Sequence, residues 1–464
     1  MPTTRIREAA VAPTVGLVWM AWIFVTAGFL PSVALAASGS ASDRGPAGIE
    51  ADGADGAAPG WSQWRGPLRD GRYEGPEWPE KLDAGSLVAT WRVEDLGESY
   101  SGPIVSRDHV FTTASEGEEE VVRAYERRTG EEVWSTRWKG SMKVPFFAAK
   151  NGSWIRATPA FDGERLYVGG MRDVLVCLDA SSGEIVWKVD FVADHSEPVP
   201  AFGFVSSPLL TDEHVYVQAG GTLAKLDKRD GRPIWRVLDD GGAMNSAFSS
   251  PILAAPLGVR QIVALTRQEL VGVDPAGGDV LWRRPIQAFR GMNILTPVIV
   301  GDMIFTAPYG GKSQLLRLAK GEKGVETSVE WEEKTQGYMT SPVVIDGHAY
   351  FFTRSRRFAC LRLEDGARAW VTEPFESSYW SLIARGDRIL ALDDAGVLRL
   401  IRATPEAYTE MDSRDLADDA TWAHLDVDGR EVFIREQGAL AAYRFAGAES
   451  ATSSSAARTS RDIR

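Results

Sequence analysis

Only two cysteines, Cys177 and Cys360, occur in the 464 residues of this sequence. A disulfide-rich secreted fold is therefore excluded, and so is a metal site built from spaced cysteine and histidine ligands. The five histidines are scattered, and no H-E-x-x-H or G-x-S-x-G motif occurs. The sequence thus lacks the common signatures of a metal centre or of a nucleophilic active site, and we expect no bound metal.

Positive charge is also scarce. The chain has 51 Lys and Arg residues against 64 Asp and Glu residues, which gives a formal net charge of −13. Nucleic-acid binding depends on cations that meet phosphates, and no polybasic segment is present to attract an anionic membrane surface. We therefore expect no nucleic-acid partner.

Helical periodicity is the third absence. The chain consists of short runs rich in Val, Leu, Ile, Phe and Tyr, separated by turn signals, as in SSPLL, VYVQAG, GTLAKLD and RPIWRV within residues 206–237. Such runs are typical of antiparallel β-sheet, with four strands in each unit.

A ten-residue pattern, x-D-x-x-x-G-x-x-x-W, recurs along the chain. It reads LDASSGEIVW at 178–187, LDKRDGRPIW at 226–235 and VDPAGGDVLW at 273–282, with related copies at 125–134 and 361–370. We interpret each copy as the hairpin between the third and fourth strands of a unit, in which the carboxylate accepts hydrogen bonds, the glycine adopts a positive φ and the tryptophan packs on a neighbouring unit. The residues of this structural repeat are Asp179, Gly183, Trp187, Asp227, Gly231, Trp235, Asp274, Gly278 and Trp282.

A second pattern precedes each turn: a small or hydroxyl residue, then proline, then an apolar strand. Clear copies begin at residues 101, 157, 206, 249, 295 and 340, and weaker copies begin at 380 and 422. Eight units of four short strands predict an all-β fold, an eight-bladed β-propeller of four-stranded antiparallel blades.

The last unit, TWAHLDVDGREVFIREQGALAAYRF, supplies only three strands. The segment LVATWRV at 87–93 contains a tryptophan, but no three strands precede it. We therefore predict that this N-terminal strand completes the C-terminal blade and closes a ring over residues 61–445, which removes the exposed sheet edges.

The N-terminus has the three regions of a secretory signal peptide: two arginines, an apolar run at 15–30, and small residues that end at Ala36. We expect a signal peptide over 1–36 and a periplasmic or extracellular location. The alternative is a membrane anchor, because the uncleaved helix over 15–36 could span a bilayer. Segments rich in Gly, Ala and Ser predict a disordered linker at 37–60 and a disordered tail at 446–464.

Cys177 and Cys360 occupy the same position of the repeat, two residues before the acidic turn position. They therefore belong to the third strands of the second and sixth blades, which are opposite each other in an eight-membered ring. A disulfide needs Cα atoms within about 7 Å. We expect two free thiols.

These patterns resemble the PQQ-like repeat family, whose eight-bladed propellers include quinoprotein dehydrogenases and the BamB lipoprotein of the outer-membrane barrel-assembly machinery. The turns at 179–187, 227–235 and 274–282 carry the resemblance, which covers roughly residues 61–445. The opening WSQWRGPLRDG at 61–71 is similar to the WRGP-type segment that begins many secreted members. The resemblance implies the fold rather than an activity, because one fold hosts many functions.

The sequence departs from both specialised branches of that family. Quinoprotein alcohol dehydrogenases typically have an adjacent cysteine pair against their cofactor, their haem-bearing relatives have C-x-x-C-H, and BamB has a lipidated cysteine; none of these occurs here. We therefore expect an exported, monomeric, non-catalytic scaffold that binds a protein, a peptide or a glycan and uses no cofactor. The alternative is a PQQ-dependent oxidoreductase with Ca²⁺, in which Arg156, Asn293 and a carboxylate contact the cofactor.

Propellers bind ligands at the mouth of the central channel, where loops lead from an outer strand into the next inner strand. The residues just before each proline motif are expected there, and aromatic rings dominate them, which suits a peptide, a glycan or a flat cofactor. The other interpretation is that these side chains pack against the N-terminal segment or close the channel. The candidate ligand-binding residues are Tyr100, Trp154, Arg156, Phe204, Phe248, Asn293, Tyr338, Tyr379, Trp380, Trp422 and His424.

The segment WSQWRGP places Trp61, Trp64 and Arg65 ahead of the closing strand. We favour a structural role, in which the tryptophans cover a sheet edge or a channel end and Arg65 pairs with a carboxylate. A binding role remains open, because Trp and Arg often act as interface anchors.

Overall fold

The computed structural model describes residues 61–195, 199–239 and 246–446. The predicted signal peptide at 1–36, the linker at 37–60 and all of the tail beyond Ala446 lie outside the described residues. Within the described ranges, no helix is both long enough and apolar enough to cross a membrane.

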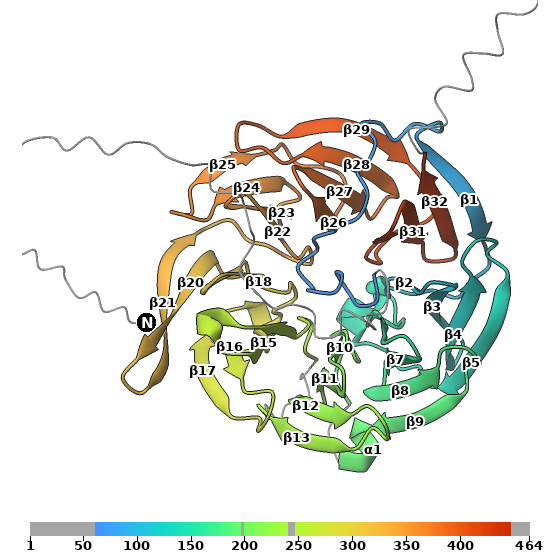
Figure 1. The fold of residues 1–464 in the computed structure, drawn as a ribbon, viewed down its shortest axis with the longest axis horizontal. Coiled ribbons are helices and arrows are strands. Elements are labelled where there is room, and N and C mark those ends of the chain that lie inside the picture. The colour runs from blue at the N-terminus through green and yellow to red at the C-terminus, as the bar shows by residue number, and fades with distance from the viewer. Residues whose placement is uncertain (1–60, 196–198, 240–245, 447–464) are drawn as a thin grey trace, which may run out of the picture. The chain divides into compact units, whose positions relative to one another are not determined.

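The described chain forms eight four-stranded antiparallel sheets, which confirms the predicted eight-bladed propeller (Figure 1). Blade 1 comprises β2 (Ile104–Val105), β3 (His109–Glu116), β4 (Glu119–Glu126) and β5 (Glu132–Lys139), and blade 2 comprises β6 (Ala160–Phe161), β7 (Arg165–Gly170), β8 (Val174–Asp179) and β9 (Ile185–Asp190). Blade 3 comprises β10 (Leu209–Leu210), β11 (His214–Ala219), β12 (Thr222–Asp227) and β13 (Pro233–Val237). Blade 4 comprises β14 (Ile252–Ala254), β15 (Gln261–Leu265), β16 (Glu269–Val273) and β17 (Val280–Pro285).

Blades 5 to 7 comprise β18 (Val298–Val300), β19 (Met303–Thr306), β20 (Ser313–Gly321) and β21 (Gly324–Glu333); β22 (Val343–Ile345), β23 (His348–Phe352), β24 (Phe358–Arg362) and β25 (Arg368–Val371); and β26 (Trp380–Arg385), β27 (Arg388–Asp393), β28 (Val397–Arg402) and β29 (Thr409–Asp415). Blade 8 comprises β30 (Asp426–Asp428), β31 (Glu431–Arg435), β32 (Leu440–Phe445) and β1 (Leu87–Val93). Short helical segments lie in the connections between strands: η1 (Phe146–Asn151), α1 (Phe191–His195), η2 (Pro256–Gly258) and η3 (Phe289–Gly291).

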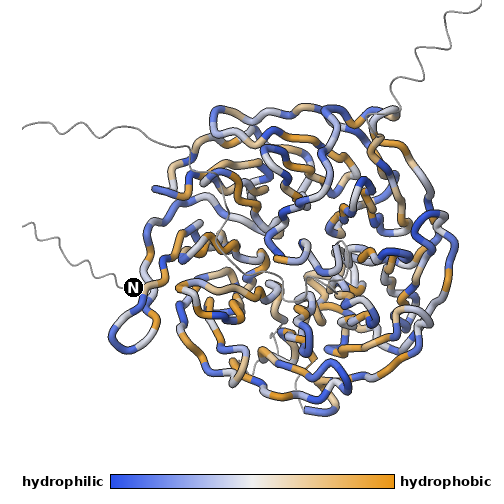
Figure 2. Tube along the Cα trace, viewed as in Figure 1, coloured by the Kyte–Doolittle hydropathy of each residue, from blue (hydrophilic) through white to orange (hydrophobic). Residues whose placement is uncertain are grey.

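Burial differs along each blade in the way that radial stacking requires. The middle strands β7 and β8 are buried on both faces, because a neighbouring blade covers each face. The outer strand β21 alternates between exposed and partly buried residues. Figure 2 shows the same contrast as hydrophobic stretches along the middle strands and hydrophilic stretches in many outer turns. The middle strands therefore read as continuous apolar runs in the sequence.

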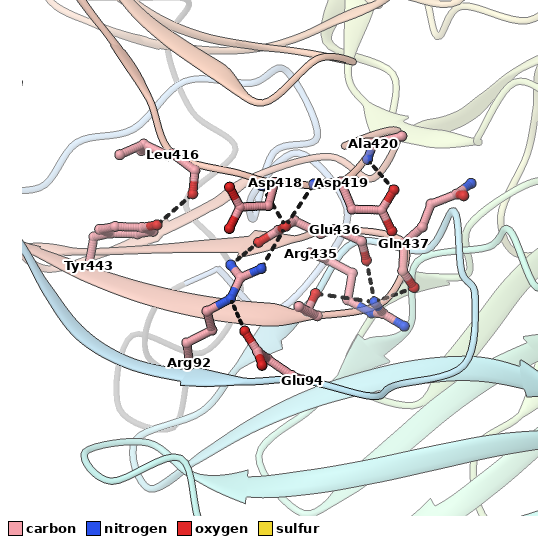
Figure 3. A network of polar contacts seen from close by, with 11 residues as sticks. Arg92, Glu94, Leu416, Asp418, Asp419, Ala420, Arg435, Glu436, Gln437 and Tyr443 are labelled. Atoms are coloured by element: carbon pink, nitrogen blue, oxygen red, sulfur yellow. Dashed lines mark hydrogen bonds and ion pairs between the residues drawn. The ribbon is translucent and has the colours of Figure 1, made fainter.

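The N-terminal strand closes the ring, as predicted. β1 pairs antiparallel with β32 over the register from Leu87↔Phe445 to Val93↔Leu440. The side chain of Arg92 in β1 also forms a two-pronged ion pair with the buried carboxylate of Glu436, which lies in the turn before β32 (Figure 3). The same carboxylate accepts hydrogen bonds from the backbone amides of Asp418 and Asp419. The closing strand is thus held by side chains as well as by the sheet ladder.

The tryptophans of the outer strands join each blade to the next. The indole N–H of Trp187 donates to the carbonyl of Lys228, 2.8 Å away, in the turn of blade 3. That turn contains Gly231, where a Cβ would lie only 2.6 Å from the Trp187 ring. The glycine is therefore required twice, by its φ of 73° and by contact with the neighbouring tryptophan.

The same bond recurs around the ring, each time to a carbonyl in the turn between the third and fourth strands of the next blade. It runs from Trp91 to Arg127 (2.8 Å), Trp134 to Ala180 (3.1 Å), Trp235 to Pro275 (3.4 Å), Trp331 to Leu363 (2.7 Å) and Trp370 to Thr404 (2.8 Å). Trp282 is the exception and donates to the side chain of Gln261 in its own blade. Blade 5 has a long β20–β21 hairpin in place of the ten-residue turn, so Trp282 has no such turn to meet.

Hydroxyl groups before the prolines form a second, inner ring of contacts. In each pair, the backbone amide before one proline donates to the hydroxyl before the next proline along the chain. The bonds run from Gly102 to Thr158 (3.0 Å), Thr158 to Ser207 (3.1 Å), Ser207 to Ser250 (3.0 Å), Ser250 to Thr296 (3.0 Å) and Thr296 to Ser341 (2.9 Å). The proline pattern is therefore a blade-to-blade contact as well as the start of a strand.

Cys177 and Cys360 lie in β8 and β24, and both are buried and free, which confirms the expectation from their repeat positions.

Asp179 has the predicted turn role, since its carboxylate accepts hydrogen bonds from the backbone N–H groups of Ser181 at 3.0 Å and Ser182 at 2.9 Å.

Replacing Trp187 should separate its apolar contact from its hydrogen bond. Trp187→Ala should lower the free energy of unfolding by roughly 3–5 kcal/mol because the ring is buried between blades. Trp187→Phe should lower the free energy of unfolding by about 1 kcal/mol more than an exposed control substitution does, because the Lys228 carbonyl loses its hydrogen-bond donor. Asp179→Ala should cost about 1 kcal/mol. Urea denaturation measures all three, with the exposed Val186→Ala as the control. A larger loss for Asp179→Ala than for Trp187→Ala would contradict this assignment.

Candidate functional site

The topology gathers one set of loops on a common face of the ring. Every inner strand runs in the same direction, so the loops that lead from an outer strand to the next inner strand share one face with the hairpins between second and third strands. We call this the mouth face. All the candidate ligand-binding residues lie in these loops or at the first residues of inner strands, as the sequence predicted.

Residues 61–73 cross the axis of the ring at the opposite face (Figure 1). The ends of inner strands from three blades hydrogen-bond to this segment. The bonds run from Phe161 N to Ser62 O (2.8 Å), from Leu210 N to the side-chain oxygen of Gln63 (2.9 Å) and from Ala384 N to Gly71 O (2.8 Å). The segment therefore acts as a plug across the axis.

Two buried arginines extend from the plug toward the mouth face. Arg65 donates to the carbonyls of Asp70, at 2.8 Å, and Pro342. Arg69 donates to the carbonyls of Ser207, at 2.9 Å, and Pro208, at 2.6 Å. Burial lowers the pKa of Arg65 to about 10 and that of Arg69 to about 9, so both stay charged at neutral pH.

The expectation that Arg65 pairs with a carboxylate was wrong. Pro208 and Pro342 directly precede the inner strands β10 and β22, which are edge strands with no other strand on the side that faces the axis. Their carbonyls are therefore open acceptors, and the guanidinium groups supply the missing donors.

One group of predicted residues comes together as an aromatic cluster on the mouth face. Tyr100 lies 5.2 Å from Trp154 and 6.1 Å from Trp422, measured between ring centroids, and Trp422 stacks on Tyr379 at 5.9 Å. The guanidinium of Arg156 lies over the Tyr100 ring at 5.0 Å. We call these five residues the tryptophan cluster. All five are partly exposed, so they can contact a ligand.

Other predicted residues are buried. The exposed fraction is 1% for Phe204, 1% for Asn293, 0% for Trp380 and 8% for His424. Trp380 stacks on Phe352 in the core with a centroid distance of 4.8 Å. A ligand on the surface cannot reach these side chains in this conformation, so the structure corrects the expectation that all of the predicted residues line a rim.

A second group of aromatic residues lines a cavity of about 270 Å³ on the mouth face, which we call the aromatic pocket. Tyr338 and Phe248 were expected near the mouth, and both line it. The remaining rings were not expected there, because they lie farther from the proline motifs. Its aromatic residues are Phe147, Phe202, Phe248, Phe289, Tyr309 and Tyr338, and the other lining residues are Ala148, Arg267, Arg290 and Met292.

One signal in the sequence could have pointed to the aromatic pocket. Phe146 and Phe147 are adjacent in a long segment that has no strand pattern, and their exposed fractions are 91% and 50%. Two neighbouring phenylalanines in a connecting loop indicate an exposed aromatic site more strongly than the single aromatic residue beside each proline does.

His424 is buried beside the plug, two residues after Trp422 of the tryptophan cluster. Its Nδ1 is 2.7 Å from the carbonyl of Leu425, which can only accept, so this nitrogen carries a hydrogen. The ring meets Trp64 edge-on at 6.0 Å. Burial, and then the positive charge of Arg65, lower the pKa of His424 to about 3. His424 is therefore neutral and holds the plug, and it is a poor candidate for proton transfer near neutral pH.

Comparison with known proteins identifies one family. The family model described as "Outer membrane protein assembly factor BamB" matches residues 117–372. The protein of that name from Yersinia pestis is 23% identical over 287 residues, which is 59% of this chain and 67% of the relative.

Two solved structures share the fold. Quinohemoprotein alcohol dehydrogenase from Comamonas testosteroni aligns with a TM-score of 0.62 at 13% identity over 85% of this chain and 82% of that chain. BamB from Moraxella catarrhalis aligns with a TM-score of 0.58 at 15% identity over 77% of this chain and 100% of that chain. These likenesses show the fold alone, since the same architecture occurs in an enzyme and in an assembly factor.

The pKa of His424 predicts an acid-dependent loss of stability. Its pKa is lower in the folded than in the unfolded chain, so the unfolded chain alone takes up the proton between about pH 6.5 and pH 3. Neutral His424 contributes up to about 5 kcal/mol to the free energy of unfolding. This contribution is complete above pH 6.5 and is lost as the pH falls below it. Urea denaturation from pH 7.5 to pH 4 should therefore show a shallower decline for His424→Gln than for the native chain. His348→Gln, at the partly exposed first residue of β23, is the control. Parallel declines for the native chain and His424→Gln would refute this role.

Proposed function

The chain belongs to the BamB family of PQQ-repeat β-propellers, and from that premise we propose that it is an exported, non-catalytic scaffold that binds a protein partner on its mouth face. The relatives are named as factors of outer-membrane protein assembly, which depends on contacts between proteins. This kinship supports a protein as the partner rather than a glycan. Export follows from the predicted signal peptide and is part of the proposal, as is the monomeric state.

The observation that carries the proposal is the exposed aromatic surface in the mouth loops. Phe146, Phe147 and Phe289 are 91%, 50% and 47% exposed, and they lie in or beside the aromatic pocket. Soluble monomers rarely expose clustered aromatic side chains, because such surface is costly in water. Aromatic and arginine side chains are also the residues that most often anchor protein interfaces.

The plug supports binding on the face rather than inside the ring. Residues 61–73 occupy the axis between the inner strands, where hydrogen bonds of their backbone and of the two buried arginines hold them. A partner that approaches the mouth face therefore meets side chains of the loops, chiefly the tryptophan cluster and the aromatic pocket.

The residues that the alternative assigns to PQQ do not fit it. Arg156 and Asn293 lie on the loops that enter blades 2 and 5, and the Asn293 amide donates to the carbonyls of Thr266, at 2.9 Å, and Arg267, at 3.2 Å. Among the described ranges between residues 61 and 446, no three His, Cys, Asp or Glu side chains are grouped to hold a cation such as Ca²⁺. We therefore derive no catalytic step through this cofactor.

Calorimetry tests the enzyme alternative directly. Titration of the purified exported protein with PQQ in the presence of CaCl₂ should give no binding at micromolar concentrations. Micromolar affinity together with reduction of an electron-accepting dye would replace the scaffold by a PQQ-dependent oxidoreductase.

Site-specific photo-crosslinking in cells tests the scaffold itself. A benzoyl-phenylalanine at position 147 should give discrete products of higher mass, because this position lies at the aromatic pocket. The matched control is position 133 in outer strand β5, whose Val133 is 47% exposed compared with 50% for Phe147. Identical products from both positions, or none from position 147, would contradict binding on the mouth face.

A further inference from the structure

We infer that the aromatic pocket takes an aromatic side chain from an acidic peptide segment of the partner. This inference rests on the proposed function and specifies the chemistry of the partner. Three observations carry it: the shape of the pocket, the charge of its lining, and the charge of the loops around it.

The pocket is built to hold a flat apolar group. Its rings form two sets that contact one another in sequence, Phe147–Phe202–Phe248 and Phe289–Tyr309–Tyr338. The centroid distances are 6.2 Å and 5.4 Å in the first set and 5.3 Å and 4.9 Å in the second. Rings at these spacings present both edges and faces, which a further aromatic ring can pack against.

The charged residues of the pocket are all cations. Arg267 and Arg290 line it, and no Asp or Glu does. The guanidinium of Arg290 lies over the Phe289 ring at 5.3 Å, and that of Arg354 lies over the Tyr309 ring at 5.0 Å. Stacking on a ring leaves the N–H edge of a guanidinium available to a carboxylate. An aromatic group with a carboxylate beside it therefore complements this lining.

Five mouth-face segments beside the pocket extend this positive charge over blades 4 to 6. They lie between the loop that enters blade 4, which carries Asp239, and the loop that leaves blade 6, which carries Glu373 and Glu376. The mouth-face segments 266–268, 286–297, 307–312, 334–342 and 353–357 contain no Asp or Glu. They contain the cations Arg267, Arg290, Lys312, Lys334, Arg354, Arg356 and Arg357. A basic sector of this kind is unusual in a chain whose net charge is −13, and it favours an acidic partner at this part of the face.

Two of these cations already pair with carboxylates of the chain, whereas two others stack on aromatic rings of the pocket. Lys312 pairs with Glu332 at 2.5 Å, and Arg357 pairs with Glu373 at 3.6 Å. For Arg290 and Arg354, the contacts that the structure gives to their guanidinium groups are with the aromatic rings of the pocket. Arg290 also has a φ of 54°, in the left-handed region that residues other than glycine rarely adopt. These two arginines are therefore the ones assigned to the partner's carboxylates.

The dimensions favour a side chain of a larger partner over a whole small molecule. Ligand pockets for cofactors and drug-sized molecules measure about 300–1,000 Å³, and this one measures about 270 Å³. The apolar surface also continues beyond the pocket to Phe146, whose ring lies 5.8 Å from that of Phe147. One ring fills the pocket, and the adjoining chain covers the neighbouring surface.

Fluorescence anisotropy with synthetic peptides tests the inference. The probe is a dye-labelled peptide, Gly-Ser-Asp-Phe-Asp-Ser-Gly, added to the full exported protein. We expect saturable binding that weakens as NaCl rises, because charge attracts the peptide. A peptide with Asn in place of both Asp residues should bind about tenfold more weakly, and so should a peptide with Ala in place of Phe.

Protein variants locate the site. Arg290→Gln combined with Arg354→Gln should weaken binding of the acidic peptide at least tenfold and leave the affinity for the neutral peptide unchanged. The control is Arg232→Gln, an exposed arginine in the β12–β13 turn on the opposite face, which should bind both peptides as the native chain does. Thermal melting of each variant verifies that the fold is intact.

Several results would overturn the inference. These are equal affinity for acidic and neutral peptides, equal affinity for the Phe and Ala peptides, and unaltered binding by the Arg290 and Arg354 double variant. If no peptide binds while photo-crosslinks from position 147 persist, the chemistry assigned here is wrong and the scaffold proposal stands. If the crosslinks fail as well, both are wrong.

Discussion

The inner edges of eight sheets face one axis, and the rest of the structure depends on how their open amides and carbonyls are satisfied. An exposed sheet edge invites pairing with another chain. The hydroxyl before each proline accepts the amide of the preceding blade along most of the ring, from Gly102 to Ser341. Proline has no amide N–H to satisfy, which removes one donor at the start of the inner strand in blades 1 to 6. The proline pattern thus solves the edge problem and sets the spacing between blades in one step.

The same constraint explains the plug and the location of the proposed binding face. Carbonyls of Pro208 and Pro342 still face the axis, and Arg69 and Arg65 donate to them. The plug supplies these donors from the face opposite the mouth and closes the axis, and the mouth loops are the surface for which we propose recognition. Outer contacts between tryptophans and turns hold the blades firmly enough to present those loops as one face. Scaffold rigidity and the proposed partner binding therefore depend on different layers of the same blade.

Much of the fold follows from local pattern, because each blade repeats the same contacts. The spacing of Asp179, Gly183 and Trp187 predicts a turn and its packing, and the three-stranded last unit predicts closure by LVATWRV. The site is harder to predict, because it depends on which loop side chains turn outward. Trp380 occupies a mouth position in the sequence pattern, yet it packs on Phe352 in the core. Phe289 and Tyr309 lie in different loops and meet only when blades 4 and 5 stack. Likewise, the carbonyl of Pro342 that accepts from Arg65 comes from main chain far away in the sequence, where residue type gives no signal.

The inner ring is tested most directly by hydrogen–deuterium exchange with residue-level resolution on the intact protein. The amides of Thr158, Ser207, Ser250 and Thr296 donate to hydroxyl groups of the following blade rather than to a strand ladder. If the ring of hydroxyl bonds closes the inner edges, these four amides should exchange as slowly as those of the buried middle strands β7 and β8. Exchange at the rate of an unstructured peptide would contradict the account, because the inner edges would then be open.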